Sequence, residues 1–201
     1  MDFDLLDDMW RCWGTRTATL TEQEWQTPTR LSGWVVQDLV AHVAPNQAVL
    51  DFLRRDPVQN PKVTSGAEML RRFNAPGGAA IGLAEEIADQ ARAAATAGPE
   101  KLCAQFTEFA PQLVETLRSQ DSSAGLDYPL LRSATFGAIG ETSLIEATVH
   151  YLDLIDAVGG PPPPPAALRA TATILAAVAD PTEFIEAATG RTDSPLFPVM
   201  R

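Results

Sequence analysis

Basic side chains are scarce in this 201-residue chain, which has 15 Lys and Arg against 26 Asp and Glu and a formal net charge of −11. Nucleic acids and anionic membrane surfaces are bound by clustered Lys and Arg side chains that displace counterions. The sequence has no such cluster. We therefore expect neither a nucleic acid nor a membrane surface as a partner.

Cysteines and long apolar runs are also lacking. Only Cys12 and Cys103 occur, and neither belongs to a Cys-x-x-Cys pair, which argues against a disulfide framework. We expect both to be small core residues rather than nucleophiles. No apolar run approaches the ~18 residues of a transmembrane helix. The chain begins MDFDLLDDMW, acidic where a secretory signal is basic, so we expect a cytoplasmic protein.

Several catalytic motifs are missing as well. The sequence has no Gly-x-Ser-x-Gly elbow, phosphate-binding loop or dinucleotide fingerprint, so the corresponding hydrolase and nucleotide-binding classes are not indicated. The alternating β-branched runs typical of strands are missing too. These absences leave an all-α fold as the expectation.

Helical periodicity is what the sequence has in abundance. An apolar stripe at helical spacing predicts a first helix, and Thr21 with Glu24 has the spacing of a capping box. A second long helix is predicted from about Val35 to Arg54, kinked or interrupted by Pro45, because proline lacks the amide hydrogen and collides with the preceding turn. The first stripe comprises Leu5, Leu6, Met9, Trp10 and Trp13.

Further helices are expected along the rest of the chain, with loops at 56–65 and 120–129. The proline run 161–165 predicts a stiff polyproline spacer. We expect residues 1–160 to form a helical bundle, and residues 161–201 to form the spacer and a short helical appendage packed on it. The predicted helices cover about 67–73, the alanine-rich run to 97, 100–119, 136–158 ending at Gly159 and Gly160, 167–179 and 181–189.

Candidate metal ligands stand out because the chain has only two histidines, His42 and His150. Glu146 precedes His150 by four residues, so both side chains project from one helix face. With His42 from a second helix they would form a set of two histidines and one carboxylate, which suits a catalytic divalent ion with an open position. From spacing alone, a surface pair or a satisfied core contact remains the alternative.

Three polar residues near the histidines are candidates for a supporting role. Asp38 and Asn46 lie four residues on either side of His42, and either would orient its imidazole. The alternative is that Asp38 caps the helix start and Asn46 is solvated, and for Asp38 we favour the cap. Asp153, one turn after His150, is the candidate catalytic residue, as a proton acceptor or a partner of His150. Its alternative is an ordinary exposed acid.

Two segments resemble the mycothiol-dependent maleylpyruvate isomerase family, part of the DinB-like metal-binding superfamily. The first, LTEQEWQTPTRLSGWVVQDLVAHVA, is similar to the family's opening motif, which leads from a Gly-Trp into a helix bearing Asp-Leu-Val-x-His. The second, ETSLIEATVHYLDLIDAVGGP, resembles its Glu-x-x-x-His-x-x-Asp helix. The later ATGRTDSPLF resembles its closing Thr-Gly-Arg.

The resemblance implies a DinB-like four-helix bundle with a divalent metal held by His42, Glu146 and His150. Zinc is the metal we expect first, with nickel, manganese and iron as alternatives. A low-molecular-weight thiol, typically mycothiol in actinobacteria, would be the cofactor or co-substrate. The metal would bind it as thiolate, and attack on an electrophilic substrate would give isomerisation or S-transfer.

Three functional hypotheses follow. The first is a metal-dependent enzyme that uses a thiol to isomerise or S-conjugate a small electrophilic metabolite. The second keeps the metal as a Lewis acid without a thiol, as in a lyase, cyclase or isomerase of specialised metabolism. The third is a non-catalytic bundle that binds a metal or ligand, and an exposed helix face would allow any of them to form a homodimer.

Overall fold

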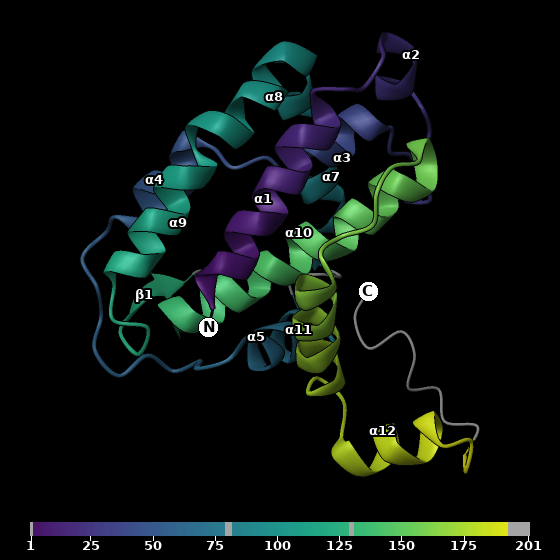
Figure 1. Cartoon of the computed structure of the whole chain (residues 1–201). Coiled ribbons are helices and arrows are strands. Elements are labelled where there is room, and N and C mark those ends of the chain that lie inside the picture. Colours follow the sequence, from purple (N-terminus) through teal and green to yellow (C-terminus); the bar gives the residue numbers. More distant parts are fainter. Residues whose placement is uncertain (1, 79–81, 129–130, 193–201) are drawn as a thin grey trace.

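The computed structural model describes residues 2–78, 82–128 and 131–192. Four helical arms pack side by side in this part of the chain (Figure 1), and they form the all-α, DinB-like bundle that the sequence predicted. Two of the arms are each built from two shorter helices. The arms are α1 (Phe3–Thr17), α3 (Val36–Val43) with α4 (Gln47–Leu53), α8 (Pro99–Glu108) with α9 (Ala110–Ser119), and α10 (Phe136–Val158).

The long helix α10 is central to the packing. It contacts α1, α3, the short helix α5 (Gly66–Phe73) and, after the proline run, α11 (Pro165–Ala176). Leu144, Ala147, Tyr151 and Leu154 are among its fully buried residues, so apolar side chains cover several of its faces rather than one stripe. A helix that is apolar on most sides is stable only when neighbours surround it. Because other helices pack against α10 on several sides, the positions of its polar side chains are well defined.

The tryptophans of α1 belong to the core, as their spacing predicted. Trp13 is fully buried, and its indole Nε1 donates a hydrogen bond of 2.8 Å to the carbonyl of Ala147 on α10. Its ring also stacks on Phe106 of α8, with 5.8 Å between centroids. Trp13 therefore ties three arms of the bundle together.

Pro45 interrupts the second helical arm, as predicted. Helix α3 ends at Val43, and α4 begins after Asn46, whose side chain accepts from the amide of Val49. At the start of α3, the carboxylate of Asp38 accepts from the amide of Val35, 3.1 Å away. Asp38 is thus a helix cap, and Asn46 is the cap of the next helix.

Two local predictions were wrong. Part of the expected loop 120–129 is a strand, β1 (Gly125–Tyr128), which pairs antiparallel with β2 (Arg132–Thr135), while Pro129 lies outside the described residues. A Cβ at Gly125 would lie 2.0 Å from the carbonyl oxygen of Ala134, so glycine permits this close pairing. The expected helix 100–119 is divided at Phe109, because Pro111 cannot donate a backbone hydrogen bond to the preceding turn.

The end of α10 is fastened to the start of the chain. Gly159 takes a positive φ of 69° at the C-cap, which glycine adopts without strain. The guanidinium of Arg16 then donates to the exposed carbonyls of Val158 and Gly159, and it forms an ion pair with Glu24. Glu24 completes the predicted capping box with Thr21 at the start of α2 (Glu22–Trp25).

The remaining helices are peripheral. Helix α7 (Ala84–Ala95) packs on α3, and α11 buries Ala167 and Thr171 against the bundle. Helix α12 (Pro181–Ala188) has no buried residue and lies apart from the four arms (Figure 1). The last part of the segment that resembled a family terminus, from Asp193 on, lies outside the described residues. None of the described helices is long and apolar enough to cross a membrane.

Candidate metal centre

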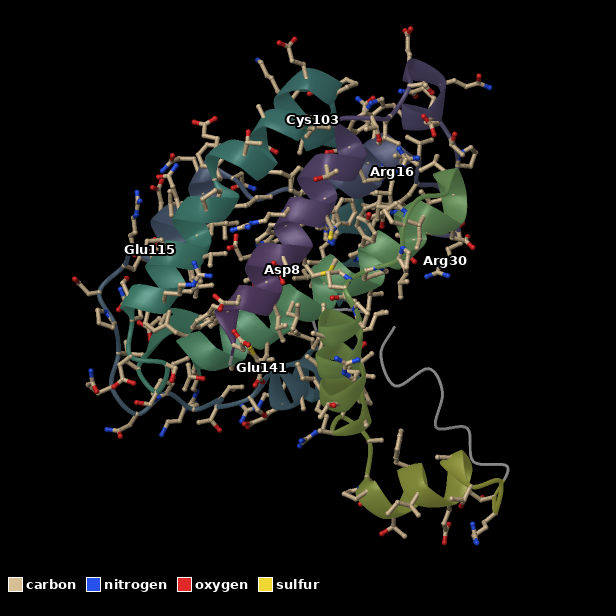
Figure 2. All side chains as sticks on the ribbon, in the orientation of Figure 1. Asp8, Arg16, Arg30, Cys103, Glu115 and Glu141 are labelled. Atoms are coloured by element: carbon tan, nitrogen blue, oxygen red, sulfur yellow. The ribbon has the colours of Figure 1, made fainter. Side chains whose placement is uncertain are left out.

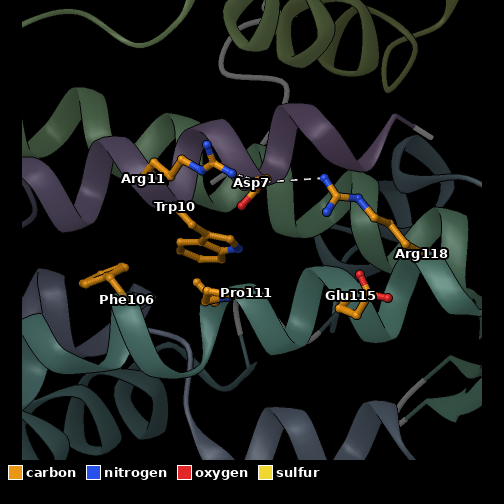
Figure 3. Close-up of a pocket in the computed structure, with 8 residues that line it drawn as sticks. Asp7, Trp10, Arg11, Phe106, Pro111, Glu115 and Arg118 are labelled. Carbon is orange, nitrogen blue, oxygen red and sulfur yellow. Dashed lines mark hydrogen bonds and ion pairs between the residues drawn. The ribbon is translucent and has the colours of Figure 1, made fainter.

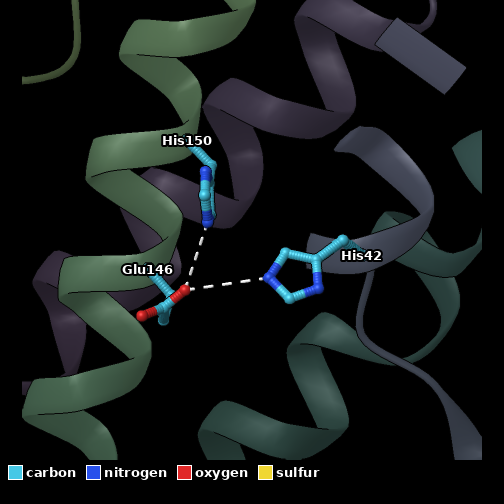
Figure 4. Close-up of side chains that lie close together, drawn as sticks. All are labelled: His42, Glu146 and His150. Atoms are coloured by element: carbon cyan, nitrogen blue, oxygen red, sulfur yellow. Dashed lines mark ion pairs between the residues drawn. The ribbon is translucent and has the colours of Figure 1, made fainter. Parts of the chain in front are cut away.

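Three side chains from two arms of the bundle meet at one point (Figure 4). His42 comes from the last turn of α3, and Glu146 and His150 come from successive turns of α10. Oε2 of Glu146 lies 3.3 Å from Nε2 of His150 and 3.9 Å from Nε2 of His42. Each of the three residues offers one possible ligand atom, and these three atoms all lie within 4.8 Å of one another. The structure therefore brings together the three residues that the sequence singled out as metal ligands.

The cluster is open to solvent on one side. The side chain of Glu146 is 39% exposed, that of His42 27% and that of His150 16%. A fully enclosed site would bury all three, as would a simple core contact. Three donors with an accessible side match the pattern of metal sites that keep a position for water or substrate.

The electrostatics of the cluster favour a carboxylate beside protonated imidazole. Burial alone would raise the pKa of Glu146, but hydrogen bonds and positive charge from His150 and His42 outweigh it and lower the pKa to about 2. Burial likewise opposes a charge on His150, yet its bonds to Asp153 and Glu146 raise its pKa to about 9. Both shifts favour an ionised Glu146 beside a protonated His150.

Asp153 lies behind His150 and holds its ring. Its Oδ2 is 2.7 Å from Nδ1 of His150, and its Oδ1 accepts from Nε of Arg30 at 2.6 Å. The Asp153 side chain is only 4% exposed, so the alternative of an ordinary exposed acid was wrong. A carboxylate on Nδ1 leaves Nε2 directed at the cluster, which is the arrangement that orients histidine ligands of metals.

His42 is held differently. The ring of Trp34 contacts it edge to face, with 5.3 Å between centroids and an interplanar angle of 90°. Asp38 and Asn46, the two candidates for orienting His42, are both used as helix caps instead. In the part of the chain that the structure describes, no side chain or carbonyl accepts from Nδ1 of His42.

Arg30 and Trp34 had no predicted role, although both lie in the segment that carried the resemblance. They belong to the loop between α2 and α3, where the amide of Thr29 donates to Trp34 and the amide of Trp34 donates to Leu31. Gly33 takes a positive φ of 79° in this loop. A turn rich in Ser and Gly directly before a ligand helix was the available signal, but it did not indicate which side chains turn back onto the site.

Tyr128 was missed because its strand was predicted as loop. Its ring packs edge to face on Phe52 of α4, at 5.5 Å, and against Phe73 of α5. Burial and the nearby carboxylate of Glu146 raise the pKa of the Tyr128 phenol. The phenol is thus near the carboxylate of Glu146, and the small hairpin contributes a polar group that helix periodicity could not reveal.

The donor set fits a divalent first-row ion. Two neutral imidazoles and one carboxylate are ligands that such ions share, and the hydrogen-bonded Asp153 supplies the support that ligating histidines normally have. The arms that carry the ligands are fixed by core packing, since Val36, Leu39 and Val40 of α3 and Ala147 and Leu154 of α10 are fully buried. The pair Glu146 and His150 is therefore part of a three-residue cluster rather than an isolated surface pair.

Comparison with known proteins agrees with this geometry. The family model for the mycothiol maleylpyruvate isomerase N-terminal domain matches residues 6–155, which include all three residues of the cluster and both sequence segments that had suggested the family. Comparison with curated proteins and with solved structures gave no match. Since the match spans most of the chain and the fold is the DinB-like bundle expected of it, the protein belongs to the mycothiol maleylpyruvate isomerase N-terminal domain family.

Proposed function

We propose that this protein is a metal-dependent enzyme that uses a low-molecular-weight thiol, of the mycothiol type, to isomerise or S-conjugate a small electrophilic metabolite. The observation that carries the proposal is the convergence of Nε2 of His42, Oε2 of Glu146 and Nε2 of His150 at an open edge of the bundle. Membership of a mycothiol-related family supports the choice of thiol.

In this proposal His42, Glu146 and His150 are the ligands of a divalent ion, and zinc is the ion we expect first. When bound, such an ion supplies positive charge that lowers the pKa of a thiol at its open position and so raises the thiolate fraction at neutral pH. Glu146 contributes the one negative charge among the ligands. We assign Asp153 a positioning role, because both of its oxygens are engaged by His150 and Arg30.

The reaction class is addition of the thiol to an electrophilic carbon. A C–S bond forms while the π bond of the conjugated C=C breaks, its electron pair moves to the carbonyl oxygen as an enolate, and the thiol proton is released. If rotation about the resulting C–C single bond follows and the C–S bond then breaks, the C=C bond re-forms, the thiol is regenerated on taking back a proton, and the product is an isomer. For the C–S bond to persist, the enolate takes up the proton at carbon. If the bond persists, the product is an S-conjugate and one thiol is consumed.

Elemental analysis tests the metal part of the proposal. Protein purified without an affinity tag should contain about one equivalent of zinc or another first-row ion, and the His42→Ala and His150→Ala variants should lack it. Arg54→Ala, at the end of α4, is a control that should retain the metal. Wild-type protein that contains no metal and takes up none when supplied would overturn the catalytic site.

Thiol dependence tests the reaction. Metal-loaded protein should convert an α,β-unsaturated carbonyl compound faster with mycothiol than without it, and His150→Ala should lose that difference. Turnover that needs the metal but is indifferent to thiol would replace this proposal with the thiol-independent Lewis acid. Metal binding without turnover of any electrophile in a broad panel would favour the non-catalytic bundle.

A further inference from the structure

The ring of Tyr128, the last residue of β1, contacts two phenylalanine rings that come from different helices. Phe52 of α4 lies perpendicular to it, with 5.5 Å between centroids, and Phe73 of α5 lies 6.1 Å away. Phe52 belongs to the arm of the bundle that carries His42, and Phe73 ends a helix that packs on α10. Contacts with two rings define the position of the phenol, and therefore of its hydroxyl group.

Helix α5 lies alongside α10 and runs in the same direction. The amide of Gly66, the first residue of α5, donates to Oε2 of Glu141 at 2.6 Å, and Figure 2 shows Glu141 near the start of α10. One turn later on each helix, Leu70 and Ile145 belong to the same buried cluster. The two helices therefore advance in step from one turn to the next.

This parallel arrangement brings Phe73 close to Glu146. The hydroxyl of Thr142 donates to Sδ of Met69 at 3.4 Å. Phe73 follows Met69 by four residues, so it lies one turn further along the same face of α5. Glu146 follows Thr142 by four residues and lies one turn further along α10. Tyr128 contacts Phe73 and is thus close to Glu146, in agreement with the pKa of its phenol, which burial and the Glu146 carboxylate both raise.

The hydroxyl of Tyr128 is unpaired and accessible. Among the residues that the structure describes, none forms a hydrogen bond with it. The unpaired side-chain N and O atoms that are fully buried belong to Trp10, Thr148 and Thr171, and the Tyr128 oxygen is not one of them. Tyr128 is half-buried as a whole. A molecule at the open side of the cluster can therefore reach this hydroxyl group.

Neighbouring polar groups are already engaged. Both oxygens of Asp153 are used, one by His150 and one by Arg30. The remaining polar side chains of the cluster are the three candidate ligands themselves. Tyr128 therefore offers a neutral hydrogen-bond donor beside Glu146 that has no other partner in the described part of the chain.

The hollow between α1 and the arm of α8 and α9 differs in this respect (Figure 3). Its two guanidinium groups, those of Arg11 and Arg118, both form ion pairs with Asp7. Its third side-chain donor, Nε1 of Trp10, has less than 1 Å² of accessible surface. The hollow therefore presents no uncommitted donor among its described lining residues, whereas the edge of the cluster presents the phenol of Tyr128.

We infer that Tyr128 is a catalytic residue whose hydroxyl donates a hydrogen bond to the carbonyl oxygen of an α,β-unsaturated carbonyl substrate. This inference rests on the proposed function. As the thiolate sulfur bonds to the electrophilic carbon, the π electron pair of the C=C bond moves to the carbonyl oxygen, which becomes an enolate oxygen. Tyr128 keeps its proton, and its hydrogen bond strengthens as negative charge develops on that oxygen.

Carbon NMR of isotope-labelled tyrosine tests the contact without turnover. The chain has two tyrosines, so the Cζ atoms give two signals, and Tyr128→Phe assigns them. Cinnamamide at millimolar concentration, added without thiol to the protein as purified, should shift the Tyr128 signal saturably and leave that of Tyr151 in place. Tyr128→Phe should lower cinnamamide affinity about fivefold. Tyr151→Phe is the matched control, since that ring contacts Trp13 of α1, and it should change affinity less than about twofold.

Kinetics test the catalytic role. In metal-loaded protein with mycothiol, Tyr128→Phe should lower kcat roughly 100-fold, as loss of one donor to a developing oxyanion does, and change KM less than about fivefold. The variant should retain the same metal content as wild type. Tyr151→Phe should keep kcat within about twofold of wild type.

Two results would overturn the inference. One is an unmoved Tyr128 signal, or undiminished cinnamamide affinity in a folded Tyr128→Phe variant. The other is a fall in kcat matched by an equal loss of metal, which would mean that Tyr128 supports the cluster rather than the substrate. The NMR measurement needs neither thiol nor turnover, so its failure is distinguishable from failure of the proposed function.

Discussion

The two histidines of the metal cluster are positioned by different kinds of interaction. His150 rises from the middle of a long buried helix, and a carboxylate that is itself bound by Arg30 fixes its ring nitrogen. His42 lies in the last turn of a short helix, and the ring of Trp34 packs perpendicular to it. A hydrogen bond fixes the orientation of a ring, whereas an aromatic contact limits only its position. The orientation of His150 on α10 is thus set without a metal, whereas that of His42 on α3 is less constrained.

The largest effect should come from removing either histidine. His42→Ala and His150→Ala should each lower metal affinity by more than the roughly 100-fold limit typical of outer-sphere changes. The two should differ in the metal-free protein. His150→Ala leaves the buried Asp153 with one partner fewer and should lower the free energy of unfolding by about 2 kcal/mol, while the more exposed His42 should cost less than about 1 kcal/mol.

Isothermal calorimetry gives the affinities, and urea unfolding of chelator-treated protein gives the stabilities. Equal losses of stability in the two variants would remove the proposed difference between the two sides of the site.

The next effect should come from the carboxylate behind His150. Asp153→Asn should lower metal affinity by roughly 10- to 100-fold, because the amide no longer stabilises the same tautomer of His150. Asp38→Asn is the matched control, since Asp38 lies one turn before His42 but serves as a helix cap. It should leave affinity within about threefold. A loss in Asp38→Asn as large as that in Asp153→Asn would contradict this assignment.

The pH dependence of metal binding tests the protonation of His150. The pKa of His150 in the metal-free site is raised to about 9, so at pH 7.5 a metal must displace its proton. Affinity should therefore rise by about tenfold per pH unit up to that pKa, with about one proton released per ion. Calorimetry in buffers of different ionisation enthalpy measures the proton count, and a count near zero would be inconsistent with a protonated His150.

The free energy of unfolding of the metal-free protein should fall as the pH rises, because of the same histidine. A folded-state pKa above the unfolded value of about 6.5 stabilises the fold fully below pH 6.5. That contribution is lost as the pH rises through about 9.

The smallest effect should come from Trp34. Trp34→Leu removes the aromatic ring beside His42, and an aromatic contact of this kind contributes about 0.5–1.5 kcal/mol, or roughly 2- to 10-fold in metal affinity. Trp25→Leu is not a suitable control because that side chain is buried in the core. Trp34→Phe should restore most of the affinity. A drop larger than that of Asp153→Asn would mean that the aromatic wall, rather than the hydrogen bond, governs the site.

Much of this fold was predictable from the sequence, because helix periodicity and capping are local. The bounds of α10 at Phe136 and Val158, the cap at Thr21 and the interruption at Pro45 all follow from residues within a few positions of one another. The hairpin was not predictable in this way. Its strands are four residues each, and their pairing depends on contacts such as the amide of Val63 with the carbonyl of Ser133.

The candidate ligands were predictable for a similar reason, and their surroundings were not. Glu146 and His150 are neighbours on one helix, so spacing alone places them on one face. Arg30 reaches Asp153 across 123 positions of the chain, from a loop whose path depends on tertiary packing. Sequence spacing therefore indicated the donors of the cluster but not the salt bridge or the indole that hold them.

The break at Pro45 has an electrostatic consequence for the site. Because α3 stops at Val43, the carbonyls of its final turn end beside His42 instead of continuing into another helical turn. The aligned peptide dipoles of a helix leave a partial negative charge of about half an elementary charge at this end. A positive charge at His42, in the last turn of α3, would lie near that negative pole, which the break at Pro45 places in this turn.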